Sequence, residues 1–399
     1  MKLLKKKFKI EEILNTRKNI LFITPSVQME KSSGGGKVTI ERLNALVLYH
    51  NVTVLTMSVD DTARQYFSGV SWHVNGSLKS RNPSVLLKSY FKGLPLSVFR
   101  NTANESINVA RGLSKVKWDL IYIDHWLMIE VAGVIKNCYS ILNLHNAEPE
   151  VFFSASKTAN NIKKIFMLIE GYRSATYLQK KISNFNCLHL LSNDDAAKLK
   201  IRGISHPNTK VFLPSVNKPN IEIAPIENRR HEVLFIGTLS WYANEEGIIW
   251  YIKNVLNYLD SYPTHQIIGS GASENLTSMV SKIPEISALG YVDNLEPFYQ
   301  SAKCLIAPLK SGSGIKIKII DALARGLPIV TTPIGIEGFP PGYQESIFVT
   351  NTPKEFAKAI ESITNDDQLW ANASKNALNY FNEHFSGIVW KNWSKELIL

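Results

Sequence analysis

Two lysines and an aspartate follow a glycine-rich turn near residue 312, and this segment is the most informative part of the 399-residue chain. The run GSGIKIKIIDALARGLPIV (312–330) places Lys316 and Lys318 in the first turn of a helix predicted over 315–325. Free backbone N–H groups, the positive end of the helix dipole and two full charges favour a bound phosphate or diphosphate. Asp321 can accept hydrogen bonds from hydroxyl groups. Together these groups predict a nucleotide-linked ligand.

Two further glycine-containing segments follow predicted strands. The sequence SSGGGK (32–37) forms a loop between a strand at 19–24 and a helix predicted over 38–49, and it has neither the P-loop nor the G-x-G-x-x-G spacing. The sequence GSG (269–271) follows a strand at 265–268, a position where open α/β sheets bind ligands. Glycines allow the backbone to approach a ligand closely. A plain surface turn is the alternative for each segment.

Two histidines also follow predicted strands. His145 comes directly after the strand at 140–144 and is followed by Asn146 and Glu148, while His125 follows the strand at 119–123. A histidine there can donate to a sugar hydroxyl or stabilise charge, and a structural histidine is the alternative. We expect no metal site, because the sequence has neither an H-E-x-x-H motif nor a His/Cys cluster with ligand spacing.

The formal net charge of +11 favours polyanionic partners. Lysines and arginines crowd the first eighteen residues between apolar side chains, which predicts either a segment on the anionic inner face of a membrane or a solvated tail. We expect no nucleic-acid partner, since no binding motif of the known kinds is present. Three widely spaced cysteines, with no signal peptide and no membrane-spanning run, indicate a cytoplasmic protein.

Strands alternate with helices on both sides of a proline-rich stretch. This alternation predicts an α/β protein with two Rossmann-like, doubly wound parallel-sheet domains. The aromatic residues near the C-terminus predict core or interdomain packing. The expected divisions are a basic N-terminal segment (1–18), a first domain (19–215), a linker (216–230), a second domain (231–383) and a C-terminal helix that packs back on the first domain (384–399).

The chain resembles the retaining glycosyltransferases of family 4, also called glycosyl transferases group 1, which have the GT-B architecture of two domains facing across a cleft. The second half carries the stronger resemblance, in FIGTLSWYAN (235–244), IIGSG (267–271), LGYVDNLEPFY (289–299), APLKSGSGIKIKIIDALARGLPIVTT (307–332) and IGIEG (334–338). The first half matches through SSGGGK (32–37), WDLIYIDH (118–125), LHNAE (144–148), LLSNDD (190–195) and LPSVN (213–217).

The resemblance implies transfer of a sugar from a nucleoside diphosphate-sugar to a lipid-linked or polysaccharide acceptor, with retention at the anomeric carbon and without a metal or other cofactor. It implies that the catalytic residues are His145 near the reacting carbon, Asp321 at the ribose hydroxyls and Lys318 at the diphosphate, with His125 on the acceptor side. The other donor-binding residues that it implies are Gly35, Gly36, Lys37, Gly237, Thr238, Gly269, Gly271, Tyr291, Val292, Ser313, Gly314, Ile315 and Lys316.

Three positions depart from the family pattern. Ser313 stands where the family has the first of two acidic residues, and Thr238 and Asn244 stand where it often has an arginine and a lysine. We expect Lys316 and Lys318 to supply the missing positive charge. Two alternatives therefore stay open: a nucleotide-sugar epimerase of the same architecture, and a non-catalytic nucleotide-sugar-binding protein.

Overall fold

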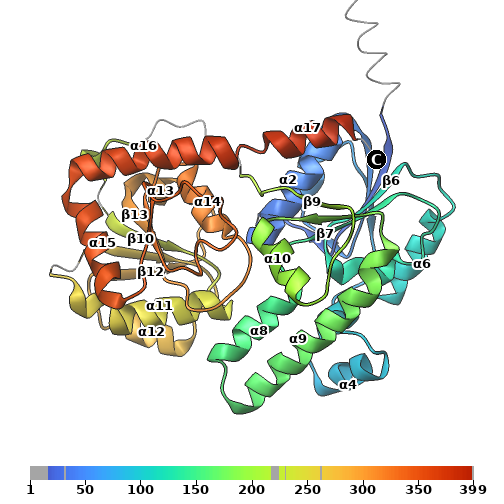
Figure 1. Ribbon diagram of the computed structural model, residues 1–399, viewed down its shortest axis with the longest axis horizontal. Coiled ribbons are helices and arrows are strands. Elements are labelled where there is room, and N and C mark those ends of the chain that lie inside the picture. The colour runs from blue at the N-terminus through green and yellow to red at the C-terminus, as the bar shows by residue number, and fades with distance from the viewer. Residues whose placement is uncertain (1–16, 31–32, 217–223, 230, 261–262, 398–399) are drawn as a thin grey trace, which may run out of the picture.

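The computed structural model describes residues 17–30, 33–216, 224–229, 231–260 and 263–397. The basic N-terminal segment expected at 1–18 lies almost entirely outside these ranges, and so does most of the linker expected at 216–230. Two α/β units stand side by side (Figure 1). None of the described helices is both long enough and apolar enough to cross a membrane.

The first unit is built on a seven-stranded sheet in the order β5-β3-β1-β6-β7-β8-β9, in which every neighbouring pair is parallel. Its strands are β1 (Asn19–Ile23), β3 (Asn51–Thr56), β5 (Ser71–Val74), β6 (Leu120–Ile123), β7 (Ser140–Leu144), β8 (Cys187–Leu190) and β9 (Thr209–Val211). Its helices are α2 (Gly34–Tyr49), α3 (Asp61–Tyr66), α4 (Pro83–Phe91), α5 (Leu96–Asn101), α6 (Asn104–Leu113), α7 (Ile129–Ala132), α8 (Glu148–Thr158), α9 (Asn161–Lys181) and α10 (Asn193–Ile201). A short pair, β2 (Ser26–Val27) and β4 (Ser58–Val59), lies apart from this sheet.

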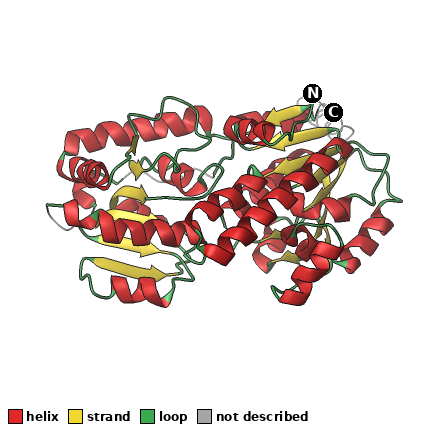
Figure 2. Cartoon of the chain, turned by 60° about the horizontal axis from the view of Figure 1, so that its bottom comes forward, coloured by secondary structure: helices red, strands yellow, loops and turns green. Residues whose placement is uncertain are grey.

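The second unit has a six-stranded parallel sheet in the order β12-β11-β10-β13-β14-β15. Its strands are β10 (His231–Ile236), β11 (His265–Ile268), β12 (Ile286–Gly290), β13 (Ala302–Ala307), β14 (Ile329–Thr331) and β15 (Ile347–Val349). Its helices are α11 (Tyr242–Asn254), α12 (Glu274–Val280), α13 (Glu296–Ser301), α14 (Ile317–Leu323), α15 (Pro353–Asn365) and α16 (Asp367–His384). Figure 2 shows helices packed around the strands in both units.

Burial explains why the central strands read as continuous apolar runs in the sequence. Residues 20–23 of β1 and the whole of β6 are buried, because helices cover both faces of the sheet. In the second unit β13 is buried along almost its whole length for the same reason. The two parallel sheets predicted from these runs are therefore present.

Two glycine-rich segments differ from their predicted local structure. Gly34, Gly35 and Gly36 form the first turn of α2 instead of a loop before it, because the Ser33 side chain caps the helix by accepting a hydrogen bond from the Gly36 N–H at 3.2 Å. The helix predicted over 315–325 is shorter, and α14 spans only Ile317–Leu323, with Lys316 at its N-cap position.

The last helix, α17 (Ile388–Glu396), leaves the second unit and lies along α2 of the first (Figure 1). The turn into it uses Gly387 at φ +73°, a conformation that favours glycine. Trp390 is buried, and its ring lies 4.3 Å from the guanidinium carbon of Arg42 on α2. The carbonyl of Ser394 contacts the His50 ring at 2.6 Å. The C-terminus therefore ties the two units together.

Replacing Trp390 with alanine tests this tie. A buried tryptophan truncated to alanine costs about 3 to 5 kcal/mol, so Trp390→Ala should lower the free energy of unfolding of the first unit by that amount in urea denaturation. Val389→Ala on the same helix is the control, because Val389 is 69% exposed and should change stability by less than about 0.5 kcal/mol. Equal unfolding curves for the two variants would contradict the packing described here.

Candidate functional site

The candidate site lies where the carboxyl ends of the two sheets meet, with α14 opposite the start of α2 (Figure 1). Glycines allow this approach. A Cβ atom on Gly34 would lie 3.4 Å from Ile317 of the other domain, and one on Gly314 would lie 2.0 Å from the Asn146 side chain. Gly314 also has φ +78°, so a larger residue would be strained as well as blocked. The site therefore lies at a narrow contact between the two domains, which we call the cleft.

An ion pair crosses this cleft. The Lys37 ammonium on α2 lies 2.5 Å from Oδ2 of Asp321 on α14, and the Asp321 side chain is only 8% exposed. The other carboxylate oxygen of Asp321 lies 3.7 Å from Arg325, which itself pairs with Glu296 at 2.8 Å. The predicted hydroxyl acceptor and the predicted phosphate-binding lysine thus meet each other directly. A ribose that bonded to Oδ2 would have to displace the Lys37 ammonium.

Lys318 lies in the second domain, where its amine contacts a neutral amide group. Its ammonium donates to Oδ1 of Asn244 at 2.6 Å, and Asn244 in turn donates to the Thr238 carbonyl at 2.9 Å. A Cβ atom on Gly237 would lie 2.8 Å from the Lys318 ammonium, so glycine leaves the space that the amine occupies. Burial, and to a smaller extent the charge of nearby Lys316, lower the pKa of Lys318 to about 7. Among the described residues, no carboxylate lies within ion-pairing distance of this amine.

Lys316 turns toward its own loop. Its ammonium donates to the Gly314 carbonyl at 2.5 Å and lies 3.9 Å from Glu337, whose nearer partner is Lys198 of the first domain at 2.8 Å. Burial lowers the pKa of Lys316 to about 8, although Glu337 opposes that shift. The two lysines therefore place two amines with lowered pKa values at the glycine-rich loop.

His145 is held by a buried carboxylate that sequence patterning did not single out. Its Nε2 lies 3.3 Å from Oδ1 of Asp124, which directly follows β6 and is fully buried. Asp124 also accepts hydrogen bonds from the hydroxyls of Thr24, at 3.2 Å, and Thr39, at 2.5 Å. On its other side, the His145 ring faces Gly35. In the sequence, Asp124 could have been found from its position directly before His125, after a predicted strand.

His125 and Glu148 form an uncharged pair beside His145. The His125 and His145 ring centroids are 4.9 Å apart, and Nε2 of His125 lies 3.9 Å from Oε1 of Glu148. Burial holds the pKa of His125 well below its usual range, and burial followed by the charge of Asp195 raises the pKa of Glu148 to about 8. At neutral pH the contact therefore joins a neutral imidazole and a protonated carboxyl group.

The remaining predicted residues have mainly packing contacts. A Cβ atom on Gly269 would lie 1.8 Å from the Gly237 carbonyl, so glycine is needed there for the loops to pack. Tyr291 donates to the Glu30 carbonyl of the first domain at 2.5 Å, which makes a second contact across the cleft. Three further predicted residues lie close by: Gly271 at φ +80° beside Ser240, Val292 packed against the second domain's core, and Ile315 in one apolar cluster with Val38.

Ser313, at the departure from the family pattern, has a buried hydroxyl oxygen with no hydrogen-bond partner among the described residues. Its carbonyl lies 3.3 Å from the Asn146 amide group, which can donate to it from the first domain. In the described part of the chain, no group of three or more His, Cys, Asp or Glu residues could hold a metal ion.

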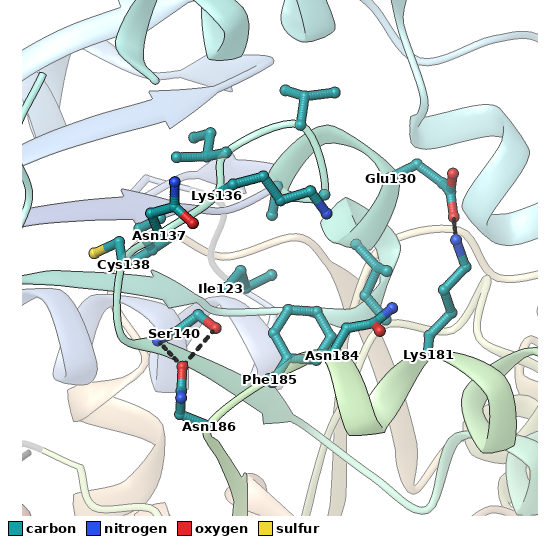
Figure 3. Close-up of a pocket in the computed structure, with 16 residues that line it drawn as sticks. Ile123, Glu130, Lys136, Asn137, Cys138, Ser140, Lys181, Asn184, Phe185 and Asn186 are labelled. Atoms are coloured by element: carbon teal, nitrogen blue, oxygen red, sulfur yellow. Dashed lines mark hydrogen bonds and ion pairs between the residues drawn. The ribbon is translucent and has the colours of Figure 1, made fainter. Parts of the chain in front are cut away.

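A crevice outside the site lies beside β6 and β7 of the first sheet. It has a volume of about 290 Å³, and Figure 3 shows the Glu130–Lys181 ion pair and the bonds from Ser140 to Asn186 on its walls. None of the predicted site residues lines it. The candidate site is defined here by the side chains that converge between the two domains.

Residues 230–366 match the family model described as "Glycosyl transferases group 1". Over 383 residues the chain is 24% identical to a Klebsiella pneumoniae protein described as an uncharacterized 44.6 kDa protein in the cps region, a match that covers 92% of this chain and 96% of that protein.

Solved structures show the same architecture. Anabaena HepE, in complex with UDP and glucose, has a TM-score of 0.69 at 14% identity, with 96% of this chain and 99% of that chain covered. WaaG, described as a glycosyltransferase involved in lipopolysaccharide biosynthesis, has a TM-score of 0.65 at 11% identity, with 95% and 99% covered. These likenesses show the fold. Residues 230–366 thus resemble the glycosyl transferases group 1 family, and the two domains together have the GT-B architecture.

Proposed function

We propose that this protein is a glycosyltransferase that moves a sugar from a nucleoside diphosphate-sugar to a lipid-linked or polysaccharide acceptor, with retention of anomeric configuration. The family of the second domain supports glycosyl transfer. The donor class is supported by the UDP and glucose bound to HepE. The cps region named for the Klebsiella relative and the lipopolysaccharide role named for WaaG support a place in surface polysaccharide or glycolipid biosynthesis.

The observation that best supports a diphosphate donor is the buried amine of Lys318. Burying a charge without a counter-charge is costly, and the lowered pKa of Lys318 expresses that cost. A diphosphate next to this amine would supply the missing negative charge. The leaving diphosphate needs such a cation as the glycosidic bond breaks, because negative charge then develops on its oxygen. We propose that Lys318 and Lys316 supply this charge and that no metal or other cofactor takes part.

The Lys37–Asp321 pair suggests how the first domain joins the donor site. When ribose hydroxyls bind to Asp321, the Lys37 ammonium is released beside the start of α2. A donor phosphate can then replace the carboxylate as its partner. Gly35 and Gly36 leave room for that phosphate, since neither has a side chain. This exchange would hold the two domains around the donor and exclude water from it.

In the proposed reaction the acceptor attacks the sugar from the same face that the diphosphate leaves, in one concerted step. The bond from the anomeric carbon to the diphosphate oxygen breaks, the acceptor oxygen bonds to that carbon, and the acceptor proton passes to the departing phosphate. His145, oriented by Asp124, would donate a hydrogen bond to the donor sugar. His125 and the protonated Glu148 would contact the acceptor, and because both are neutral they suit hydroxyl groups better than charged ones.

A thermal-shift panel of nucleoside diphosphates and their sugar conjugates, without added metal, tests the proposal first. A ligand that binds only the folded state raises its stability by about 2.7 kcal/mol at a hundredfold excess over its dissociation constant. Stabilisation by one diphosphate family, followed by sugar transfer to a glycan or lipid-linked acceptor, is the expected result. Donor turnover to an isomeric sugar without transfer would identify an epimerase instead, and binding without turnover would identify a non-catalytic binding protein.

Proton uptake on binding follows from the pKa of Lys318. At about pH 8 the free amine is mostly neutral, because its pKa lies near 7, and a bound diphosphate raises that pKa and makes the amine take up a proton. Affinity for the diphosphate should therefore fall as pH rises through the range from about 7 to 9. Titration calorimetry at about pH 8, in two buffers of different ionisation enthalpy, should detect the uptake. Binding heats that do not depend on the buffer would argue against an amine at the phosphates.

Removing the amine should weaken donor binding without harming the fold. A hydrogen bond to a charged group contributes about 1.5 to 3 kcal/mol, so Lys318→Met should raise the dissociation constant for the nucleoside diphosphate by about 10- to 100-fold. Lys282→Met is the control, because Lys282 is an exposed lysine of the same domain. Calorimetry measures both variants, and circular dichroism checks their folding. If Lys318→Met binds like the control, Lys318 is not at the phosphates.

A further inference from the structure

Large apolar side chains are exposed on two neighbouring helices of the first domain. On α9, Ile162 and Ile165 are 85% and 60% exposed, and on α4 Phe91 is 82% exposed. The other large apolar residues exposed on these helices are Leu87, Tyr90, Ile169 and Tyr172. Exposed aliphatic and aromatic side chains that gather in one place commonly mark an interaction site. We call these seven residues, with the lysines between them, the α4–α9 surface.

The apolar residues of α9 form a single stripe. Ile162, Ile165, Ile169 and Tyr172 follow one another at spacings of three and four residues, which places them on one face of the helix. The opposite face, which includes Ser174, Ala175 and Leu178, is buried in the domain. The stripe therefore lies on the solvent side of α9.

Arg173, next to this stripe, joins α9 to α4. Its guanidinium carbon lies 3.9 Å from the centroid of the Tyr90 ring, and its Nη2 lies 3.3 Å from the Ser89 hydroxyl. Figure 1 accordingly shows α4 beside α9, at the edge of the first domain away from α17. Arg173 thus links α9, next to the exposed Tyr172, to the exposed Tyr90 of α4.

The exposed charges of this region are positive. The segments 79–100 and 151–169 contain no aspartate or glutamate, but they contain eight lysines and arginines. Five of the lysines are exposed among or beside the apolar residues: Lys88, Lys92, Lys157, Lys163 and Lys164. The carboxylate within α9 is Glu170, which is buried, pairs with Arg173 and accepts the Leu96 N–H at 2.8 Å. The exposed lysines therefore meet no compensating negative charge on these two helices.

The surface is connected to the candidate site by one helix. α8 begins at Glu148, beside His125, and ends at Thr158, just before α9 starts at Asn161. Eleven helical residues span about 16 Å, and α8 packs along α9 throughout the hairpin. A planar partner at the tip of this hairpin would thus lie about one helix length from the acceptor side of the cleft.

We infer that the α4–α9 surface rests on a membrane that contains anionic lipids. Apolar side chains flanked by lysines are the pattern of helices that lie in the lipid headgroup region. A protein partner fits less well, because lysine is depleted at protein–protein interfaces. This contact is separate from residues 1–18, and it does not depend on the identity of donor or acceptor.

Vesicle flotation with the full chain tests this inference. The vesicles are phosphatidylcholine alone, or phosphatidylcholine mixed with phosphatidylglycerol, without any glycan-bearing lipid. The test variants are the doubles Ile162→Ser with Ile165→Ser, and Lys163→Gln with Lys164→Gln. The matched controls are Ile201→Ser, since Ile201 is 81% exposed on α10, and Lys354→Gln with Lys358→Gln, two exposed lysines of the second domain.

The wild-type chain should float with the anionic vesicles and remain behind with the neutral ones. Each lysine near such a surface contributes about fivefold in partitioning, so the lysine double should bind about 25-fold more weakly, while both controls bind like wild type. The isoleucine double should also lose binding. Nucleoside diphosphate binding should be unchanged in all variants, which separates this test from that of the proposed function.

Two results would overturn the inference. In the first, both test variants float like the wild-type chain, and deletion of residues 1–16 abolishes flotation. The N-terminal segment would then account for the whole attachment. In the second, light scattering shows that the wild-type chain is a dimer and that the isoleucine double variant is a monomer. The surface would then be an interface between two copies.

Discussion

The structure depends on the close approach of two chain segments from different domains, the start of α2 and the glycine-rich loop before α14. Backbone can come this near to a neighbouring side chain only where a Cβ atom is missing, and Gly314 against Asn146 meets that condition. The approach brings Lys37 to Asp321 and Tyr291 to Glu30. Charged groups from separate domains thus meet at one site.

The buried ionisable groups around this contact offset the cost of burying a charge in different ways. Asp124 stays satisfied because two threonine hydroxyls and His145 surround it. Glu148 and His125 avoid the cost of burial by remaining neutral near pH 7. Lys318 lies beside the neutral Asn244 amide and the ring of Phe235, and burial lowers its pKa. This difference distinguishes Lys318 from groups whose role is to hold the fold, and it makes Lys318 the group most responsive to an anion.

The departures from the family pattern make physical sense once the contacts are known. Asn244, at a position where related proteins often carry a positive charge, accepts from the Lys318 ammonium and donates to the Thr238 carbonyl. It therefore orients a charge that comes from another segment of the chain. Ser313 has a buried hydroxyl beside the glycine-rich loop, and its carbonyl faces Asn146. The substitution at 313 thus removes a carboxylate from a crowded part of the cleft.

The amino-acid sequence by itself determined the two parallel-sheet domains, because strands buried on both faces must be continuously apolar, as β1 and β6 are. It also identified the glycines and lysines of the site, whose residue types alone suit phosphate. It gave little signal for the short helices α3 to α6, which span at most ten residues each and expose much of their surface.

Only the tertiary structure decided which groups meet. Lys37 and Asp321 are 284 positions apart, Lys318 and Asn244 are 74 apart, and Asp124 reaches His145 across neighbouring strands. No local pattern encodes such pairs, because they form only when segments far apart in the sequence come together in the folded chain. The pKa values of Lys318 and Glu148 likewise follow from desolvation, which depends on how the whole chain encloses them and not on the residues beside them in sequence.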